Sequence, residues 1–406
     1  MNRPPHIAVT GLGMVTAAGV GVPGTWARLC EGVPTAALDP ELEGLPVSFA
    51  CRVPTAPVKA AAPGLAWRAD PFIRFAVAAA QEAVADSGLD RGAWDAPRVA
   101  VVIGVGGTTH DLTPKASAAL AERRFQAIPP TLVPRSAPNM AAGYVGMTLG
   151  AEGPTLCTST ACASGATAIG TAALLLRAGM CDIAVAGGSE SVSRVTSAAF
   201  WRMGALSTRG HDPVGASRPF DSERDGFVLG EGAGVLVLER AADARARRAR
   251  PYALLTGYGA SGDAHHATSP HPEGAGAQRA MRAALADAGL SPQDIDHVNA
   301  HATSTVLNDR IEAHALHGVF GTPPPVTATK SVLGHSLGGA GAIEAVVSAL
   351  TLRHQLIHPT ANLDRLDDAI ALDVVTKRAR PARVGAVVTT SFGFGGQNAA
   401  LVLQRC

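Results

Sequence analysis

The feature that most constrains the fold is an alternation of short β-branched and aliphatic runs with longer alanine-rich stretches of helical periodicity. In the first part of the chain the strand-like runs are 7–10, 99–104, 182–187 and 234–239, and the clearest helix-like stretches are around Trp26 and at 72–87. Strands that alternate with helices form βα units, in which the sheet is covered by helices and its strands run parallel. The pattern therefore predicts an α/β protein with a largely parallel, buried sheet.

The alternation stops at a charged segment and then begins again. Residues 240–251 are rich in Arg and Ala and end at Pro251, which indicates a helix and a connection. Beyond it, strand-like runs occur at 252–259, 296–300, 384–391 and 399–404, and helix-like stretches at 276–288 and 338–352. We therefore expect two similar halves, 1–250 and 251–406, on the evidence of the pattern alone.

Composition and charge exclude several classes of protein. The 406 residues are 47% hydrophobic and 17% charged, which is typical of a large, well-packed core. A formal net charge of +1 provides no overall field for nucleic acid or an anionic membrane. No apolar run approaches the roughly 20 residues of a membrane span. The six cysteines show no paired zinc spacing and no disulfide framework. We expect a soluble, cytoplasmic protein that binds neither nucleic acid nor membrane.

A candidate nucleophile lies in the segment 160–165, Thr-Ala-Cys-Ala-Ser-Gly, which precedes an Ala/Leu-rich helical stretch at 166–178. A cysteine at the start of a helix is close to the positive end of the helix dipole, which favours the nucleophilic thiolate. A single cysteine in an alanine-rich helix is more often a buried structural residue. Cys162 therefore needs other chemical groups to support a catalytic role.

Two histidines supply that support. His301 lies in the segment 299–305, which follows a strand-like run, where a loop at the carboxyl end of a strand places side chains in a crevice. His335 lies in the segment 330–336, just before a Gly-rich helix start. Two histidines in small-residue loops with hydroxyl neighbours indicate a site. A fourth motif, the Gly-rich loop 391–398 between two strands, would on its own be an ordinary hairpin.

These four motifs, in this order, resemble the active-site motifs of the elongating β-ketoacyl-[acyl-carrier-protein] synthases of the thiolase superfamily. The resemblance covers essentially the whole chain, and it includes the further stretches 9–13, 218–221, 224–227 and 230–234. It implies the thiolase fold, in which five layers, α-β-α-β-α, are built from two similar fused halves. It also implies an acyltransferase that is usually a dimer.

The resemblance further implies a two-step condensation. Cys162 accepts an acyl chain from a phosphopantetheine thioester, so that one difficult reaction is divided into two easier ones. Malonyl-carrier protein then loses CO2, and the neutral imidazoles of His301 and His335 donate hydrogen bonds to the resulting enolate oxygen. The implied partner is an acyl carrier protein. No metal and no other cofactor are expected.

Other residues take roles by the same resemblance. The backbone N–H groups of Cys162 and Phe394 are expected to bind the oxyanion of the acyl-cysteine, and the Phe394 ring matches the family's gating phenylalanine. The hydroxyls of Thr303 and Thr305 match groups that hydrogen-bond the pantetheine amides.

Two acidic residues and a lysine match family positions beside the histidines. We expect Lys330 and Glu312 to form a partly buried ion pair that orients the site rather than transferring protons. Asp309 matches a further family position that supports the same loop.

Several positions differ from the housekeeping fatty-acid enzyme. Gly204 replaces an arginine that contacts the carrier, and a usually basic cluster is reduced to Arg68 with Arg74 nearby. Gln397 replaces a threonine, and the stretch 103–109, which limits acyl length in the family, is atypical. Fewer fixed cations weaken the attraction of an acidic carrier. These differences favour a type II polyketide synthase over the alternative, a housekeeping fatty-acid synthase.

Other functions within and beyond the superfamily fit less well. A thiolase acting on coenzyme A thioesters needs a second cysteine in the C-terminal Gly-rich loop, and 391–398 contains none. Starter-type condensing enzymes use one histidine and an asparagine, which His335 argues against. A non-catalytic chain-length subunit lacks the nucleophile, whereas Cys162 is present. A plain α/β binding protein leaves the motifs unexplained. The active assembly is expected to be a homodimer or a heterodimer with a chain-length-factor-like subunit.

Overall fold

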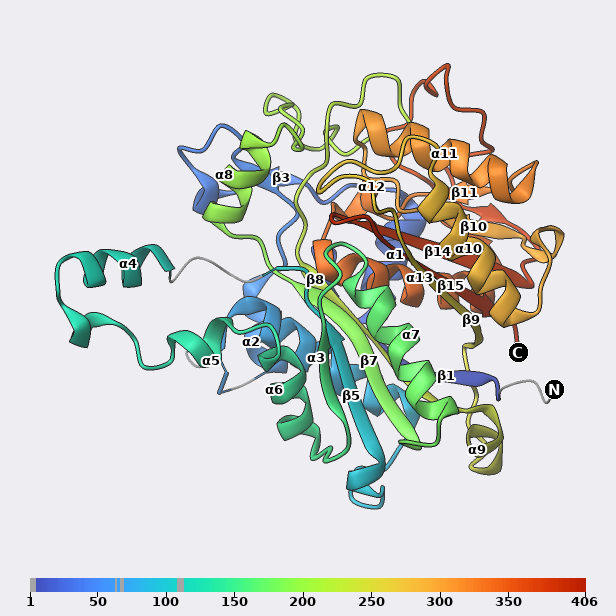
Figure 1. Ribbon diagram of the computed structural model, residues 1–406, viewed down its shortest axis with the longest axis horizontal. Helices are drawn as coiled ribbons and strands as arrows, with labels where there is room; N and C mark the ends of the chain where they lie inside the picture. Colours follow the sequence, from blue (N-terminus) through green and yellow to red (C-terminus); the bar gives the residue numbers. More distant parts are fainter. Residues whose placement is uncertain (1–4, 63, 66–68, 108–112) are drawn as a thin grey trace.

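The computed structural model describes residues 5–62, 64–65, 69–107 and 113–406 (Figure 1). The strands of the first half are β1 (Ile7–Thr16), β2 (Gly19–Val20), β3 (Ala37–Leu38), β4 (Phe49–Ala50), β5 (Val99–Gly104), β6 (Thr155–Thr158), β7 (Ile183–Glu190) and β8 (Gly232–Arg240). Its helices are α1 (Val22–Glu31), α2 (Thr55–Ala61), α3 (Pro71–Ser87), α4 (Thr113–Ala121), α5 (Leu132–Ser136), α6 (Met140–Leu149), α7 (Ser164–Arg177), α8 (Arg194–Arg202) and α9 (Ala241–Ala246).

The second half repeats the mixture of strands and helices. Its strands are β9 (Ala253–Gly262), β10 (His297–Asn299), β11 (Val326–Thr327), β12 (Leu356–Ile357), β13 (Arg380–Pro381), β14 (Ala386–Gly393) and β15 (Gln397–Gln404). Its helices are α10 (Ala275–Ala288), α11 (Val306–Phe320), α12 (Lys330–Leu333) and α13 (Ala340–His354). Short 3₁₀ turns occur at Pro40–Leu42, Ala96–Arg98, Phe125–Ala127, Pro292–Asp294 and Leu337–Gly339.

The main sheet has the same strand order in both halves. Its order is β11-β10-β14-β15-β9-β1-β8-β7-β5-β6, with β2 pairing beside β1. We number the strands of the main sheet in each half in chain order, leaving out β2. From β1 and β9 outward, both halves then have the order first, fifth, fourth, second and third. The strand directions also match, since β8 and β15 are antiparallel to both neighbours. This duplication supports the division at residue 250, which remains our proposal for the domain boundary.

The expectation of a largely parallel sheet was wrong. The parallel pairs in the described part of the sheet are β5 with β6 and β7, and β10 with β11 and β14. All its other pairs are antiparallel. The reason is local in the second half, because only Phe394–Gly396 separate β14 from β15, and so short a connection can join only antiparallel strands.

Five layers result, as the thiolase fold requires. Helices α7 and α13 pack between the two halves of the sheet, α3 and α6 cover the outer face of the first half, and α10 and α11 lie on the outside of the second (Figure 1). Helix α13 is buried from Ala340 to Leu352. A helix enclosed on all sides must be apolar around its whole circumference, which explains its Ala/Val/Leu composition. Within the described residues, no helix is both long and apolar enough to cross a membrane.

Two glycines of β1 set the distance to the outer helix layer. A Cβ at Gly11 would lie 2.1 Å from the carbonyl oxygen of Ala83, and one at Gly13 would lie 1.9 Å from that of Ala79. Both carbonyls belong to α3. Any side chain at these positions would therefore push α3 away from the sheet.

Two buried histidines belong to the second half, His297 at the start of β10 and His358 directly after β12. The side chains of His297 and His358 are fully buried, and neither ring nitrogen of His297 has a hydrogen-bond partner within the described residues. Burial lowers the pKa of His297 to about 3 and that of His358 to about 4. Both imidazoles are therefore neutral in the folded protein.

These histidines should make the protein sensitive to acid. Between pH 6.5 and about 4 the unfolded chain binds protons that the folded chain excludes, so stability is full above pH 6.5 and falls as the pH falls. His297→Leu should reduce the loss of unfolding free energy between pH 7 and pH 5 by about 2 kcal/mol, measured by urea unfolding. His211→Leu, at an exposed position, is the control. The same pH dependence in both variants would contradict the account.

Candidate active site

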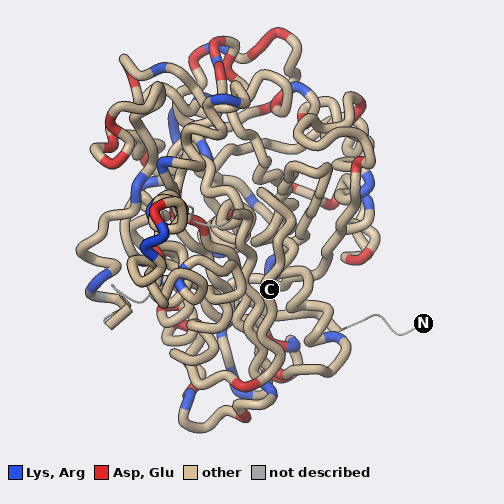
Figure 2. The backbone as a smooth tube through the Cα atoms, turned by 60° about the vertical axis from the view of Figure 1, so that its left-hand side comes forward, with Lys and Arg blue, Asp and Glu red and all other residues tan. Residues whose placement is uncertain are grey.

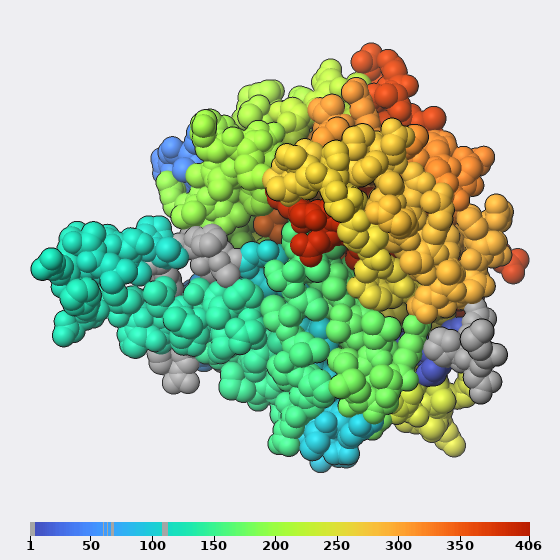
Figure 3. All heavy atoms as spheres, viewed as in Figure 1, coloured from blue at the N-terminus to red at the C-terminus, as the bar shows by residue number. Residues whose placement is uncertain are grey.

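The four motifs meet in one pocket of about 500 Å³ at the junction of the two halves. Cys162, His301, His335 and Phe394 all line it, as do Thr303 and Thr305. In Figure 3 the red atoms of the C-terminal segment lie at the bottom of a hollow in the surface. The sequence-predicted catalytic side chains are therefore neighbours in space, although they come from segments up to 232 residues apart, from Cys162 to Phe394.

Cys162 lies in a strained turn between β6 and α7. Ala161 has φ of 49°, a left-handed conformation that is unfavourable for a residue with a Cβ. The Ser164 hydroxyl stabilises the turn, because it donates to the Ala161 carbonyl at 2.6 Å and accepts from the Thr160 N–H at 2.9 Å. The turn presents the Cys162 sulfur to the pocket two residues before α7 begins.

His335 is in direct contact with the nucleophile. Its Nε2 lies 3.1 Å from the Sγ of Cys162. The backbone of His335 is fixed like a strand, since its N–H donates to Val228 at 2.8 Å and its carbonyl accepts from Gly230 at 2.9 Å. The Phe227 ring meets the imidazole edge-on at 5.3 Å between centroids. The Nδ1 of His335 has no partner within the described residues, so no protein group there fixes its tautomer.

His301 completes the pair. Its ring centroid lies 5.4 Å from that of His335, with the planes at 86°. Its Nδ1 lies 3.4 Å from the Nζ of Lys330. An ammonium can only donate, so Nδ1 accepts and the ring proton is on Nε2. His301 is thereby held as an N–H donor.

The expected ion pair between Lys330 and Glu312 was wrong. Lys330 is 2% exposed and pairs with Glu344 of α13, which is 1% exposed. Glu312 instead accepts hydrogen bonds from the N–H groups of His301 and Ala302, at 2.8 and 2.7 Å, and from the Thr390 hydroxyl at 2.8 Å. The sequence does contain a signal for Glu344, since it is the only charged residue between 338 and 352.

Glu312 and Asp309 hold the His301 loop in a strained conformation. Ala302 and Ser304 have φ of 36° and 72°, and backbone strain of this kind persists only where the surroundings enforce it. The Asp309 carboxylate accepts from the N–H groups of Ser304 at 3.2 Å and Phe220 at 2.8 Å. The supporting position expected for Asp309 is thus what the structure shows. The motif 218–221 contributes to the same contact.

Burial keeps the three reactive groups neutral. Burial and the Lys330 ammonium hold the pKa of both His301 and His335 well below 6.5. Burial raises the pKa of Cys162 to about 12, although Lys330 pulls it down. The thiolate expected from the helix dipole is therefore not the resting form. The site holds a neutral thiol beside two neutral imidazoles.

The two segments of the predicted oxyanion site pack together, and the binding of an oxyanion between their N–H groups stays a prediction. A Cβ at Gly393 would lie 3.2 Å from the Cys162 nitrogen, so the loop that carries Phe394 packs directly on the nucleophile turn. Within the described residues, the N–H groups of Cys162 and Phe394 make no hydrogen bond to another residue. Thr303 and Thr305 lie along the pocket with their hydroxyls 3.0 Å apart.

The structure describes some of the positions that differ from the fatty-acid enzyme. Gly204 lines the pocket. Arg74 lies on α3. Arg68, together with Thr108 and Thr109 of the stretch 103–109, lies outside the described residues.

Comparison with known proteins agrees with this geometry. The family model of the β-ketoacyl synthase N-terminal domain matches residues 5–244, and that of the C-terminal domain matches residues 252–364. The 3-oxoacyl-[acyl-carrier-protein] synthase 2 of Rhizobium meliloti is 41% identical over 416 residues, covering 98% of this chain and 99% of the relative. A Streptomyces cyaneus protein named as a polyketide β-ketoacyl synthase is 42% identical over 419 residues, covering 98% and 97%.

A solved structure shows the same fold. The ishigamide ketosynthase/chain length factor matches with a TM-score of 0.92 and 35% sequence identity, covering 99% of this chain and 100% of that one. The five-layered thiolase fold is thereby confirmed.

Lys330→Met should allow the two pocket imidazoles to protonate at higher pH. The ammonium lowers both pKa values, so its removal raises them. Because burial, the larger cause, remains in the variant, we expect the pKa of His301 and of His335 to be higher in the variant than in the wild type but still below 6.5. The measurement is ¹⁵N NMR of the imidazoles, with the exposed Lys377→Met as control. An unchanged titration would contradict a close ammonium–imidazole contact.

Proposed function

The chain belongs to the β-ketoacyl synthase family, and we propose that it condenses a Cys162-bound acyl chain with malonyl-acyl carrier protein, releasing CO2. It is an acyltransferase of the 3-oxoacyl-carrier-protein synthase type. The observation that carries the mechanism is the contact of 3.1 Å between the Cys162 sulfur and His335 Nε2, with His301 beside it.

The first step transfers the acyl group. The Cys162 sulfur attacks the carbonyl of the carrier thioester, a new C–S bond forms and the bond to the carrier sulfur breaks. Because the resting thiol is protonated, its proton must leave during the attack, and His335 Nε2 is within reach to accept it. The departing carrier thiol takes up that proton. The Cys162 and Phe394 N–H groups stabilise the oxyanion.

The second step forms the carbon–carbon bond. Malonyl-carrier protein loses CO2, and the electron pair of the broken C–C bond becomes an enolate. The N–H of His301 stabilises the enolate oxygen without giving up a proton, and His335 adds a second N–H donor once its ring proton has moved from Nδ1 to Nε2, a tautomer that no protein group among the described residues opposes. The enolate carbon attacks the acyl-cysteine carbonyl, and Cys162 leaves as the thiolate, which takes up a proton from solvent to restore the thiol. That no metal or cofactor takes part remains a prediction.

We propose that the pathway is polyketide assembly rather than housekeeping fatty-acid synthesis. Identities of 41% and 42% to relatives of the two kinds do not separate them. The replacement of the carrier-contacting arginine by Gly204 favours a dedicated carrier. A preference for β-ketoacyl chains over saturated ones would support polyketide assembly, and the reverse preference would indicate fatty-acid elongation.

The carrier protein is proposed to dock on an apolar rim. Its pantetheine arm must enter the pocket, so the carrier has to sit at the entrance, where Met203 and Leu307 line the pocket and are 49% and 51% exposed. No Lys or Arg lines the pocket among the residues that the structure describes. The nearby Arg202 guanidinium lies 5.8 Å from the centroid of the Trp201 ring. Carrier binding at this rim should therefore depend more on apolar contact than on charge.

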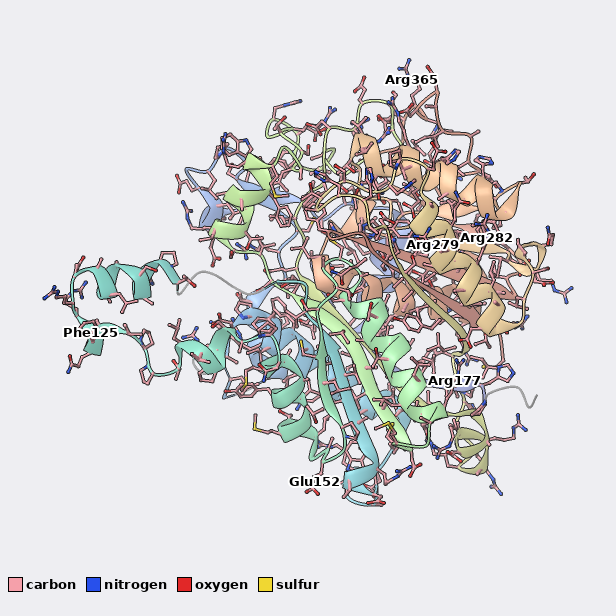
Figure 4. The ribbon with its side chains drawn as sticks, viewed as in Figure 1. Phe125, Glu152, Arg177, Arg279, Arg282 and Arg365 are labelled. Atoms are coloured by element: carbon pink, nitrogen blue, oxygen red, sulfur yellow. The ribbon has the colours of Figure 1, made fainter. Side chains whose placement is uncertain are left out.

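A second subunit of the same fold is proposed to pack on the first half. Strand β6 ends the sheet, so its outer edge has no strand partner within the described residues. Between Arg135 and Arg177 the only charged residue is Glu152, and Figure 2 shows how the charged residues are distributed along the backbone. The arm 113–139 extends from the body, with Phe125 at its end and Val133 70% exposed (Figures 1 and 4). An open sheet edge with exposed apolar side chains favours subunit contact. The partner is a second copy or a chain-length-factor-like subunit.

Cys162→Ala should abolish both acylation and condensation. The variant lacks the only thiol in the pocket lining given by the described residues, so no acyl-enzyme can form. Intact mass spectrometry after incubation with acyl-carrier proteins should show one acyl group on the wild type and none on the variant. Cys157→Ala, at a partly buried cysteine outside the pocket, should acylate normally. Substantial elongation activity in Cys162→Ala would contradict the assignment of Cys162 as the nucleophile.

Met203→Ser and Leu307→Ser should each raise the KM for a carrier-bound substrate by roughly fivefold, because each loses about 1 kcal/mol of apolar contact. Acylation by a small acyl thioester, which needs no docking, should not change. Val214→Ser, equally exposed but outside the pocket, is the control. A KM that rises steeply with salt in the wild type, together with no effect of either rim variant, would show that charge controls docking.

A further inference from the structure

A buried glutamate at the end of β7 has no part in the two condensation steps. Glu190 is 3% exposed and does not line the pocket. Its Oε2 accepts hydrogen bonds from three backbone N–H groups: those of Gly106 at 2.8 Å, Gly107 at 3.1 Å and Gly338 at 3.2 Å. These donors come from two segments that are more than 200 residues apart in the chain. One carboxylate oxygen therefore ties the loop after β5 to the turn after His335.

This junction is packed against the nucleophile turn. A Cβ at Gly106 would lie 2.8 Å from the nitrogen of Gly338 and 3.0 Å from the carbonyl oxygen of Ala161, the residue before Cys162. A Cβ at Gly338 would lie 2.1 Å from the nitrogen of Gly106. Three backbone segments meet here with no room for a side chain. Their relative positions, and with them the distance between Cys162 and His335, therefore depend on the acceptor that Glu190 provides.

The glutamate also acts on the nucleophile through its charge. Burial raises the pKa of Glu190 to about 8, while the backbone N–H groups lower it. The thiol of Cys162 titrates above that range, so Glu190 is ionised over the pH range in which the free thiol titrates, although it is mostly protonated near pH 7. Its negative charge then opposes the thiolate, as does that of Glu344, whereas the Lys330 ammonium favours it. The remaining titratable groups beside the sulfur are the neutral imidazoles of His335 and His301.

We propose that Glu190 is a positioning residue for the condensation: its carboxyl group fixes the His335 turn against the nucleophile turn, and in its ionised form its charge disfavours the Cys162 thiolate. The inference rests on the proposed function for its kinetic part only. A carboxylate accepts hydrogen bonds from several N–H groups more strongly than a neutral oxygen does, and the glutamate side chain is long enough to reach all three donors. Removing it leaves three buried N–H groups without an acceptor.

Two substitutions distinguish the positioning role of Glu190 from the effect of its charge. Glu190→Gln keeps an oxygen acceptor and removes the charge, whereas Glu190→Ala removes both. Above about pH 8, where Glu190 is ionised, loss of its negative charge lowers the pKa of the neighbouring thiol, so both variants should react faster there with iodoacetamide at Cys162, with the alkylation profile displaced to lower pH. The condensation kcat should stay within about threefold of wild type in Glu190→Gln and fall about a hundredfold in Glu190→Ala, with the carrier KM unchanged in both.

Glu82→Ala is the matched control. Glu82 of α3 also accepts two backbone N–H groups, those of Met14 at 2.9 Å and Val22 at 2.8 Å, but lies outside the pocket lining. Its loss should lower stability without moving the alkylation profile or kcat.

An unchanged alkylation profile in Glu190→Gln would overturn the role of the charge, and a wild-type kcat in Glu190→Ala would overturn the positioning role. If Glu190→Ala does not fold, a kcat in Glu190→Gln as low as that of Cys162→Ala would also overturn it. If the wild type accepts no acyl group from any carrier, the proposed function fails, while alkylation still tests the effect of Glu190 on Cys162.

Discussion

The buried ammonium of Lys330 is the interaction on which the arrangement of the site depends. It contacts His301 Nδ1, pairs with Glu344 of α13 and lowers the pKa of both imidazoles. A charge this deeply buried is tolerated only when it is paired and hydrogen-bonded. The cost of burial is offset by Glu344, and the ammonium fixes His301 as an N–H donor and, together with burial, keeps both imidazoles neutral. The same ammonium opposes the effect of burial on the Cys162 thiol.

The duplicated fold explains why these groups meet. Helices α7 and α13 are the central layer, and each begins beside a reactive residue, Cys162 before α7 and His335 before α13. The two halves have the same strand order, so the carboxyl ends of their parallel strands face one junction. The hairpin of β14 and β15 then places Phe394 over the nucleophile turn. A pocket at the junction of two fused halves is a consequence of this topology.

The sequence predicted those parts of the fold that depend on local pattern. The strand at 99–104 and the helix at 72–87 agree with β5 and α3, because a β-branched run and an alanine-rich amphipathic stretch leave little choice. The predicted strand directions were wrong, because the alternation of strands and helices along the chain does not reveal which strands become neighbours in the sheet. Helices α6 and α11 were not predicted.

The site, like the fold, could be predicted only in part from the sequence. Resemblance brought together Cys162, His301 and His335, which the structure places in contact, but it assigned Lys330 the wrong partner. The choice between Glu312 and Glu344 is decided by how α13 packs across the sheet, which no local pattern reveals. The protonation of the thiol was also misjudged, because burial outweighs the helix dipole and burial is a property of the folded chain.

A single turnover tests the central claim most directly. Enzyme acylated beforehand on Cys162 would be mixed with ¹³C-malonyl-carrier protein, and the acyl-enzyme, the CO2 and the carrier products would be followed by quenched-flow mass spectrometry. The account predicts that loss of the Cys162 acyl group, release of CO2 and appearance of the extended β-ketoacyl-carrier product share one rate constant. Release of CO2 while the acyl group stays on Cys162 would contradict a condensation at this site.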